Sequence, residues 1–105
     1  QRALISGYMT EALDSIMRIR HCSCNYIPGL LQWADFPDIG GLIAPRYLII
    51  QSGKKDSIFP TESAERAFNK IKNVYAVFDA PDNVVFHQHD GYHSFWSPSL
   101  DNLLD

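Results

Sequence analysis

Two side chains of the sequence, Asp56 and His93, have the types and the placement needed for acid–base chemistry. Asp56 lies at the tip of a polar, glycine-containing turn that follows the apolar run 47–50. His93 follows a second strand-like run, 84–88, after an intervening turn. A carboxylate that fixes the tautomer of an imidazole, and stabilises the imidazolium, is the acid and base part of a nucleophilic triad. We therefore predict that Asp56 and His93 form a catalytic pair.

This pair depends on two parallel strands whose carboxyl ends lie at the same edge of a sheet. The apolar run 47–50, bounded by turn signals, is typical of a parallel strand that is buried on both faces. The segment 61–78 has its apolar residues on one face, which predicts a long amphipathic helix. If this helix joins strands 47–51 and 84–88, Asp56 and His93 follow neighbouring strands about 4.8 Å apart. Open α/β sheets place their chemistry at that edge.

The order of the elements predicts the α/β fold class. Strands at about 3–6, 46–52 and 84–89 alternate with helical segments, which implies crossover helices and a parallel sheet. Residues 10–45 are predicted to form a helical insert after the first strand. At this length we expect one partial domain over residues 1–105. Because a strand-like run begins almost at once after Gln1, we expect a piece of a longer protein.

Several shorter helices are also predicted from local signals. Residues 11–20 have helical spacing of their apolar positions, with Thr10 as the N-cap. Residues 30–33 are expected to form one helical turn. Asp35 is expected to cap a further short helix that ends before Pro45.

Composition and charge exclude some function classes. The net charge is −3 and there is no run of Lys or Arg, so we expect neither a nucleic acid nor an anionic membrane as a partner. No apolar stretch approaches the roughly 18 residues of a membrane span. Cys22 and Cys24 are separated by one residue, and a disulfide across that spacing would be strained. We expect free thiols, which favour a reducing, cytoplasmic compartment.

Two metal sites are alternatives to the catalytic pair. His87 and His89 would point to the same face of a strand, and together with His93 they have a spacing that metal ligands use. Cys22 and Cys24 with the adjacent His21 form a weaker set. We predict no cofactor, because the strand that contains His87 and His89 should pack on both faces.

A third alternative is a non-catalytic interaction module. Parallel strands need both faces covered, and a partial sheet would leave an open edge near Leu4. Such an edge favours pairing with another chain, either as a homo-oligomer or with the N-terminal half of the same protein.

The sequence resembles the α/β-hydrolase superfamily, most closely its acetyl-xylan-esterase and dienelactone-hydrolase-like branch. The resemblance rests on the run Gly-Leu-Ile-Ala-Pro-Arg-Tyr-Leu-Ile-Ile-Gln-Ser-Gly-Lys-Lys-Asp-Ser-Ile-Phe-Pro and on the run His-Cys-Ser-Cys-Asn-Tyr-Ile-Pro-Gly-Leu-Leu that begins at His21. In that branch the acid sits in a Gly-x-x-Asp-x-x-Phe-Pro setting and the base in a Gly-x-His setting. The matching residues here are Gly53, Asp56, Phe59, Pro60, Gly91 and His93.

The sequence departs from this superfamily at the nucleophile. The Gly-x-Ser-x-Gly elbow is absent, and Ser6 lies in an Ile-Ser-Gly setting that lacks the first glycine. We interpret Ser6 as structural. The resemblance implies a serine hydrolase of small carboxylic esters, for which this chain supplies the acid Asp56 and the base His93. The chain alone is expected to be inactive.

Overall fold

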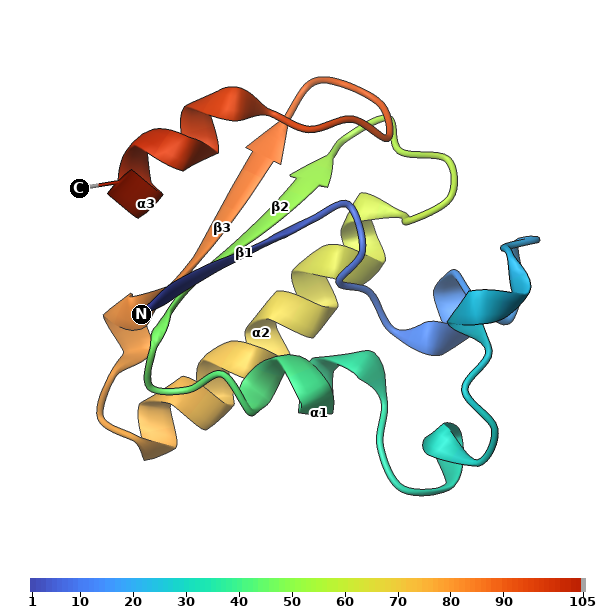
Figure 1. Ribbon diagram of the computed structural model, residues 1–105, viewed down its shortest axis with the longest axis horizontal. Helices are drawn as coiled ribbons and strands as arrows, with labels where there is room; N and C mark the ends of the chain where they lie inside the picture. The colour runs from blue at the N-terminus through green and yellow to red at the C-terminus, as the bar shows by residue number, and fades with distance from the viewer. Residues whose placement is uncertain (105) are drawn as a thin grey trace.

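The computed structural model describes residues 1–104. Its centre is a sheet of three parallel strands in the order β1-β2-β3 (Figure 1). The strands are β1 (Arg2–Ser6), β2 (Tyr47–Gly53) and β3 (Val84–His89). The predicted α/β class, the parallel direction and the three strand positions are therefore confirmed.

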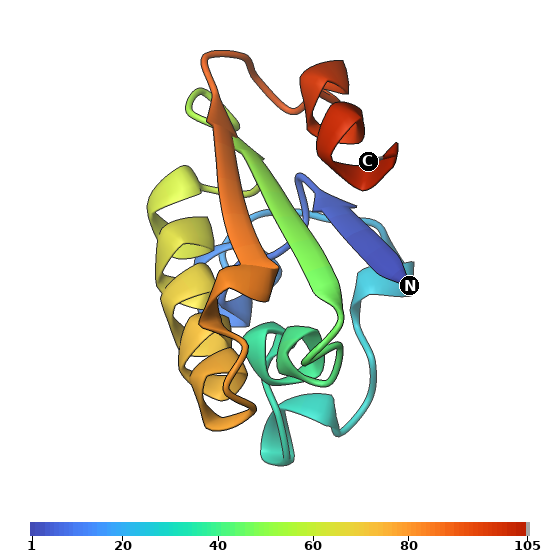
Figure 2. The same cartoon turned by 90° about the vertical axis from the view of Figure 1, so that its left-hand side faces the viewer.

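Helices cover both faces of the sheet. Helix α2 (Thr61–Val77) lies on one face with α1 (Phe36–Gly41) beside it, and α3 (Asp101–Leu104) lies on the other face (Figure 2). Short 3-10 turns complete the chain, at Ala12–Asp14, Ser23–Asn25, Leu30–Gln32, Pro81–Asn83 and Ser97–Leu100. Within residues 1–104, no helix has both the length and the apolar character needed to cross a membrane.

The core forms between β2 and α2. Leu48 and Ile50 alternate along β2 and are fully buried in one apolar cluster with Ile71 and Tyr75 of α2. Burying an aliphatic side chain of this size contributes roughly 2 kcal/mol. The contact between α1 and α2 is close, because a Cβ at Gly40 would lie 2.7 Å from Cδ1 of Ile71. This packing fixes α2, and with it the direction in which the chain returns to β3.

The predicted start of α1 is confirmed at Asp35. Its Oδ1 accepts a hydrogen bond from the backbone N–H of Phe36 at 2.7 Å. The side chain of Asp35 also accepts from the backbone N–H of Asp38, and Oδ2 of Asp38 accepts from the N–H of Asp35 at 2.7 Å. This reciprocal arrangement is a capping box, which satisfies N–H groups that a helix start leaves without partners.

The predicted helix over residues 11–20 is wrong. Only the 3-10 turn Ala12–Asp14 forms there, and Glu11 rather than Thr10 occupies the N-cap position. Thr10 is buried, and no hydrogen bond is found for its hydroxyl group.

Contacts with distant residues hold this segment in its irregular conformation. The N–H of Glu11 donates to Oγ of Ser63 at 3.0 Å, and the N–H of Ala12 donates to Oδ1 of Asp35 at 2.9 Å. The hydroxyl of Ser15 donates to the carbonyl of Ile58. The backbone of Ser15 is not helical, with φ −123° and ψ −77°, and these tertiary contacts override the local apolar spacing.

Candidate active site

Asp56 and His93 lie together at the carboxyl edge of the sheet. Asp56 follows β2 in a short turn, and His93 follows β3 in the loop that leads towards α3. Nδ1 of His93 is 2.8 Å from Oδ2 of Asp56. The structure therefore brings the two predicted residues into contact, as the strand order led us to expect. Their role in catalysis stays a prediction.

The turn after β2 holds the Asp56 carboxylate in place. Oδ1 accepts hydrogen bonds from the backbone N–H groups of Ile58 and Phe59, both at 2.9 Å. This is the local arrangement that Asp favours in turns, where the side chain bonds the backbone two residues on. The Asp56 side chain is only 1% exposed, so its carboxylate is fixed by two amides and faces His93 with the other oxygen.

His93 combines a fixed nitrogen with an accessible one. A carboxylate only accepts hydrogen bonds, so Nδ1 of His93 is the donor in this contact, and in the neutral imidazole Nε2 then carries the lone pair. The imidazole stacks on the ring of Phe59, with 5.5 Å between the ring centroids and 20° between the planes. The His93 side chain is 46% exposed. Nε2 is therefore able to take a proton from a group that approaches from solvent or from another segment of protein.

The loop that contains His93 is hydrogen-bonded to the turn that contains Asp56. The backbone N–H of Lys54 donates to the carbonyl of His89 at 2.8 Å, and the N–H of Lys55 donates to that of Gly91 at 3.0 Å. Gly53 permits this approach, because a Cβ there would collide with the carbonyl oxygens of Gly91 and Tyr92. The glycine of the predicted acid motif is thus explained by the close passage of two loops.

Gly7, which sequence reasoning did not select, lies against the pair. It follows β1 with φ +59°, and a Cβ at this position would lie 3.1 Å from Cε1 and 3.2 Å from Nδ1 of His93. The signal available in the sequence was a glycine directly after the first strand, but nothing local indicated its partner.

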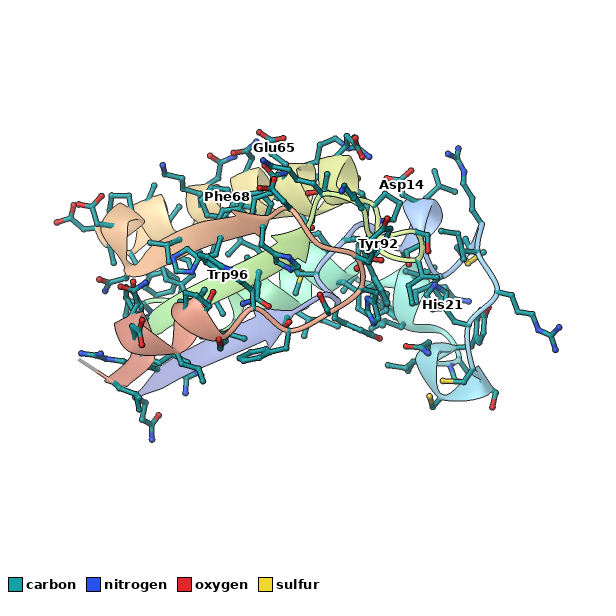
Figure 3. The ribbon with its side chains drawn as sticks, turned by 90° about the horizontal axis from the view of Figure 1, so that it is seen from above. Asp14, His21, Glu65, Phe68, Tyr92 and Trp96 are labelled. Atoms are coloured by element: carbon teal, nitrogen blue, oxygen red, sulfur yellow. The ribbon has the colours of Figure 1, made fainter. Side chains whose placement is uncertain are left out.

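A cavity of about 420 Å³ opens beside the pair and includes His93, Gly7, Tyr8, Phe59 and His21 in its lining. His21 was predicted only as a member of a metal site. Its ring packs on Phe59 at 4.9 Å between centroids, and Phe59 also stacks on His93. Seen from above, His21 and Tyr92 lie at the end of the sheet towards which the strands point (Figure 3).

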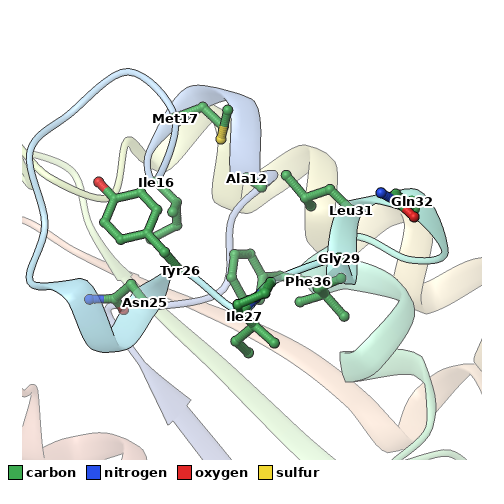
Figure 4. Close-up of a pocket in the computed structure, with 12 residues that line it drawn as sticks. Ala12, Ile16, Met17, Asn25, Tyr26, Ile27, Gly29, Leu31, Gln32 and Phe36 are labelled. Carbon is green, nitrogen blue, oxygen red and sulfur yellow. The ribbon is translucent and has the colours of Figure 1, made fainter.

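A second pocket, of about 350 Å³, is apolar and lies outside the pair (Figure 4). Its lining includes Ile16, Met17, Tyr26, Leu31 and Phe36, but neither Asp56 nor His93. Of these two pockets, only the cavity beside His93 includes a residue of the predicted pair in its lining.

The two predicted metal sets are not assembled. Nδ1 of His87 lies 2.8 Å from Oγ of Ser99, and Nδ1 of His89 accepts from the backbone N–H of Gly91 at 3.1 Å. Nε2 of His21 lies 2.9 Å from Oγ of Ser15. In the part of the chain that the structure describes, residues 1–104, no group of three His, Cys, Asp or Glu side chains could hold a metal ion.

The parallel sheet, its crossover helix and the contact between a carboxylate and an imidazole at its carboxyl edge are features of the α/β-hydrolase class. The Abhydrolase family matches residues 7–100, and the chain belongs to this family. The resemblance to the α/β-hydrolases is thereby confirmed.

Two solved structures are similar to the chain. One is a carbohydrate esterase family 15 (CE15) glucuronoyl esterase from Caldicellulosiruptor kristjansonii, at 28% identity and a TM-score of 0.60, covering 67% of this chain and 18% of that one. The other is methylesterase BT1017, at 23% identity and a TM-score of 0.52, covering 65% and 15% respectively. The chain thus spans less than a fifth of the length of either. Among curated proteins, none matches the sequence.

Proposed function

We propose that the protein containing this chain is a serine hydrolase of carboxylic esters, with Asp56 and His93 as the acid and base of its triad. The observation that supports this most directly is the 2.8 Å contact between Nδ1 of His93 and Oδ2 of Asp56. It leaves Nε2 of His93 as the free basic nitrogen at the edge of a cavity. That is the arrangement an activated serine requires.

The reaction follows from these positions. A serine hydroxyl, which we expect from a segment outside this chain, attacks the acyl carbonyl while Nε2 of His93 accepts its proton. The imidazolium is stabilised by Asp56, and it then returns the proton to the oxygen of the leaving alcohol. An acyl-serine remains, and water repeats the same proton transfers to release the acid. Ser6 is not proposed as the nucleophile, because its hydroxyl donates to Oε1 of Gln51 at 2.7 Å.

The ester class is supported by the proteins that this chain resembles. A glucuronoyl esterase and a methylesterase both cleave ester bonds by their names, and the first is 28% identical over the covered part. We therefore propose a small carboxylic ester as the substrate. Neither a cofactor nor a metal is required for the proton transfers that His93 and Asp56 perform in this scheme.

Substitution of the pair in the hydrolase that contains this chain tests the proposal. Asp56→Ala and His93→Ala should each reduce kcat for a chromogenic acetyl ester by roughly four orders of magnitude, as triad substitutions do. Hydrolysis at the wild-type rate by either variant would contradict the assignment. Asp82→Ala is the control, since Asp82 is exposed in the 3-10 turn that precedes β3, at the opposite end of that strand from His93, and it should retain activity.

The 105-residue chain on its own should give no turnover that a serine-directed inhibitor abolishes, because it contains no proposed nucleophile. Such turnover in a preparation shown to be free of other esterases would contradict our interpretation of Ser6. Together, the two measurements separate the role of the pair from the origin of the nucleophile.

A further inference from the structure

We propose that Gln51 is a positioning residue for the proposed reaction, because it fixes the loop that presents His93 to Asp56. Gln51 lies within β2, and only 1% of its surface is exposed. Its side chain reaches the segment between His93 and α3, on the side of the sheet opposite to α2. This inference rests on the proposed role of His93, and it concerns how the imidazole is held.

The side chain of Gln51 makes every hydrogen bond that it is able to make. Its Nε2 donates to the carbonyl of Trp96 at 2.7 Å and to Oγ of Ser99 at 2.8 Å. Its Oε1 accepts from the backbone N–H of Trp96 at 2.9 Å and from the hydroxyl of Ser6 at 2.7 Å. A glutamine amide has two donors and an oxygen that accepts two bonds, so none is left unused.

These bonds tie the backbone of Trp96 to the centre of the sheet. Both polar groups of that backbone bind the same side chain, so the position and the orientation of Trp96 relative to β2 are set together. Hydrogen bonds in a buried, fully satisfied network are strengthened by the low local dielectric. The ring of Trp96 lies over the strands (Figure 3) and stacks on His89, with centroids 6.3 Å apart.

His93 lies between this anchor and a second one. Before His93, the carbonyl of Gly91 is held by the N–H of Lys55 at 3.0 Å. After His93, the chain makes a tight bend, with the N–H of Ser94 donating to the carbonyl of Tyr92 at 2.9 Å, and then meets Gln51 at Trp96. Without Gln51, the bend that presents His93 would lose the side chain that holds its downstream end.

Such a loss should reduce turnover more than substrate binding. A displacement of a catalytic group by about 1 Å can cost roughly a hundredfold in rate, even when the substituted residue is far from the chemistry. Gln51 is buried and all four of its side-chain hydrogen bonds are made to protein groups, so it has no free polar group with which to bind the ester.

The experiment compares Gln51→Leu with Gln88→Leu. Gln88 is on the neighbouring strand β3, and its Nε2 donates to Oγ1 of Thr61 at 2.8 Å, on the α2 side. In the 105-residue chain, we expect Gln51→Leu to broaden or abolish the NMR signal of the proton on Nδ1 of His93. Gln88→Leu should leave that signal unchanged. In the hydrolase that contains the chain, Gln51→Leu should lower kcat by roughly tenfold to a hundredfold, with a much smaller change in KM.

A second variant covers the case in which Gln51→Leu does not fold. Gln51→Glu keeps the size of the side chain and can still accept from Ser6, but as a carboxylate it cannot donate to the carbonyl of Trp96. We expect the same loss of the His93 signal and of kcat. A folded variant of either kind with a wild-type signal and wild-type kcat would overturn the inference.

The outcome is distinguishable from failure of the proposed function. If Asp56→Ala retains ester hydrolysis, the catalytic pair is wrong, whatever Gln51 does. If Asp56→Ala and His93→Ala are inactive while both Gln51 variants behave as wild type, the catalytic assignment of the pair is supported. Only the positioning role of Gln51 is then wrong.

Discussion

At the scale of single residues, the most consequential contact that the sequence did not reveal is that of Gly7 with the His93 imidazole. The N–H of Gly7 donates to the carbonyl of Gln51 at 2.9 Å, which continues the pairing of β1 with β2 beyond the strand. Its φ of +59° lies in the left-handed region, and its missing side chain leaves room for the ring of His93. Because Gly7 has no side chain, the ring of His93 fits against it at the wall of the cavity.

Gly7→Ala should disturb the pair as well as the fold. The added Cβ would lie 3.1 Å from Cε1 of His93, and the left-handed backbone costs about 1 kcal/mol or more for an alanine. We expect a lower free energy of unfolding in urea, together with a shifted NMR signal for the proton on Nδ1 of His93.

Gly29→Ala is the matched control for this substitution. Gly29 has φ +76°, and a Cβ there would have no atom within 4 Å. It should therefore lose a similar amount of stability with no effect on His93. Equal effects of the two substitutions on the His93 signal would show that the contact with Gly7 does not hold the ring.

At the scale of elements, the local sequence pattern predicted helices and strands correctly where tertiary packing favours the same structure. The apolar run of β2 and the one-sided stripe of α2 predict the elements that form, because their apolar faces meet in the core. Asp35 predicts the start of α1, because the capping box is closed by neighbours in the chain. The segment 11–20 does not form the predicted helix: the backbone turns away at Ser15, whose hydroxyl is bonded to the distant carbonyl of Ile58.

This irregular segment is attached to α2 by charged groups. Arg66 donates from Nε to Glu11 at 2.7 Å and from a second nitrogen to Asp14, and Nζ of Lys70 lies 3.0 Å from Glu11. The hydrogen bonds from Arg66 and then Lys70 lower the pKa of Glu11. The hydroxyl of Ser63, followed by Arg66, lowers the pKa of Asp14.

Acid should therefore destabilise the fold through this cluster. A carboxyl group whose pKa is lower in the folded state contributes stability above its unfolded pKa, and that stability disappears as the pH falls through the folded pKa. Arg66→Met should reduce the urea unfolding free energy at about pH 7, and the deficit should shrink as the pH falls through the lowered folded-state pKa values of Glu11 and Asp14, because protonation removes their charge interaction with Arg66.

Lys72→Met provides the comparison for this experiment. Lys72 is also on α2, and its ammonium group lies 5.8 Å from the ring centroid of Phe68 instead of beside a carboxylate. Its difference from wild type should not depend on pH in the acid range. A pH-independent deficit for Arg66→Met would show that the cluster contributes through packing alone.

At the scale of the whole molecule, the described residues 1–104 leave both edge strands of the sheet, β1 and β3, without an outer neighbouring strand, and the edge at β1 is the one predicted to pair. β1 pairs only with β2, and its outer side is approached by α3, where Arg2 donates to the carbonyls of Asn102 and Leu103, both at 3.1 Å. Because the N–H of Gly7 points to β2, the N–H groups of Leu4 and Ser6 alternate with it and point outwards. This edge supports the proposal that the chain pairs with another strand.

The isolated chain is expected to associate through this edge. Sedimentation should detect a dimer or larger species whose fraction rises with concentration, and Leu4→Pro should reduce it, because proline removes an outward N–H. A folded wild-type chain that stays monomeric at all concentrations would contradict this prediction.

The candidate site was predictable in part, for a reason of geometry. Asp56 and His93 follow successive parallel strands, so the order of elements alone brings them to one edge. Gly7 and Gln51 were not predictable, because their partners are determined by register and by side-chain direction across the sheet. Phe59 was selected as part of a motif, but its stacking on His93 depends on the course of both loops.

The position of His93 and Asp56 in the sequence has a consequence for gene rearrangement. One continuous stretch, 47–96, contains both residues and the two amides that bind the carboxylate. It also contains the hydrogen bonds between Gln51 and Trp96. A rearrangement that cuts the gene anywhere outside that stretch would move the proposed acid and base as a unit. In the proposed mechanism, the serine is the triad member that a new neighbour would then have to supply.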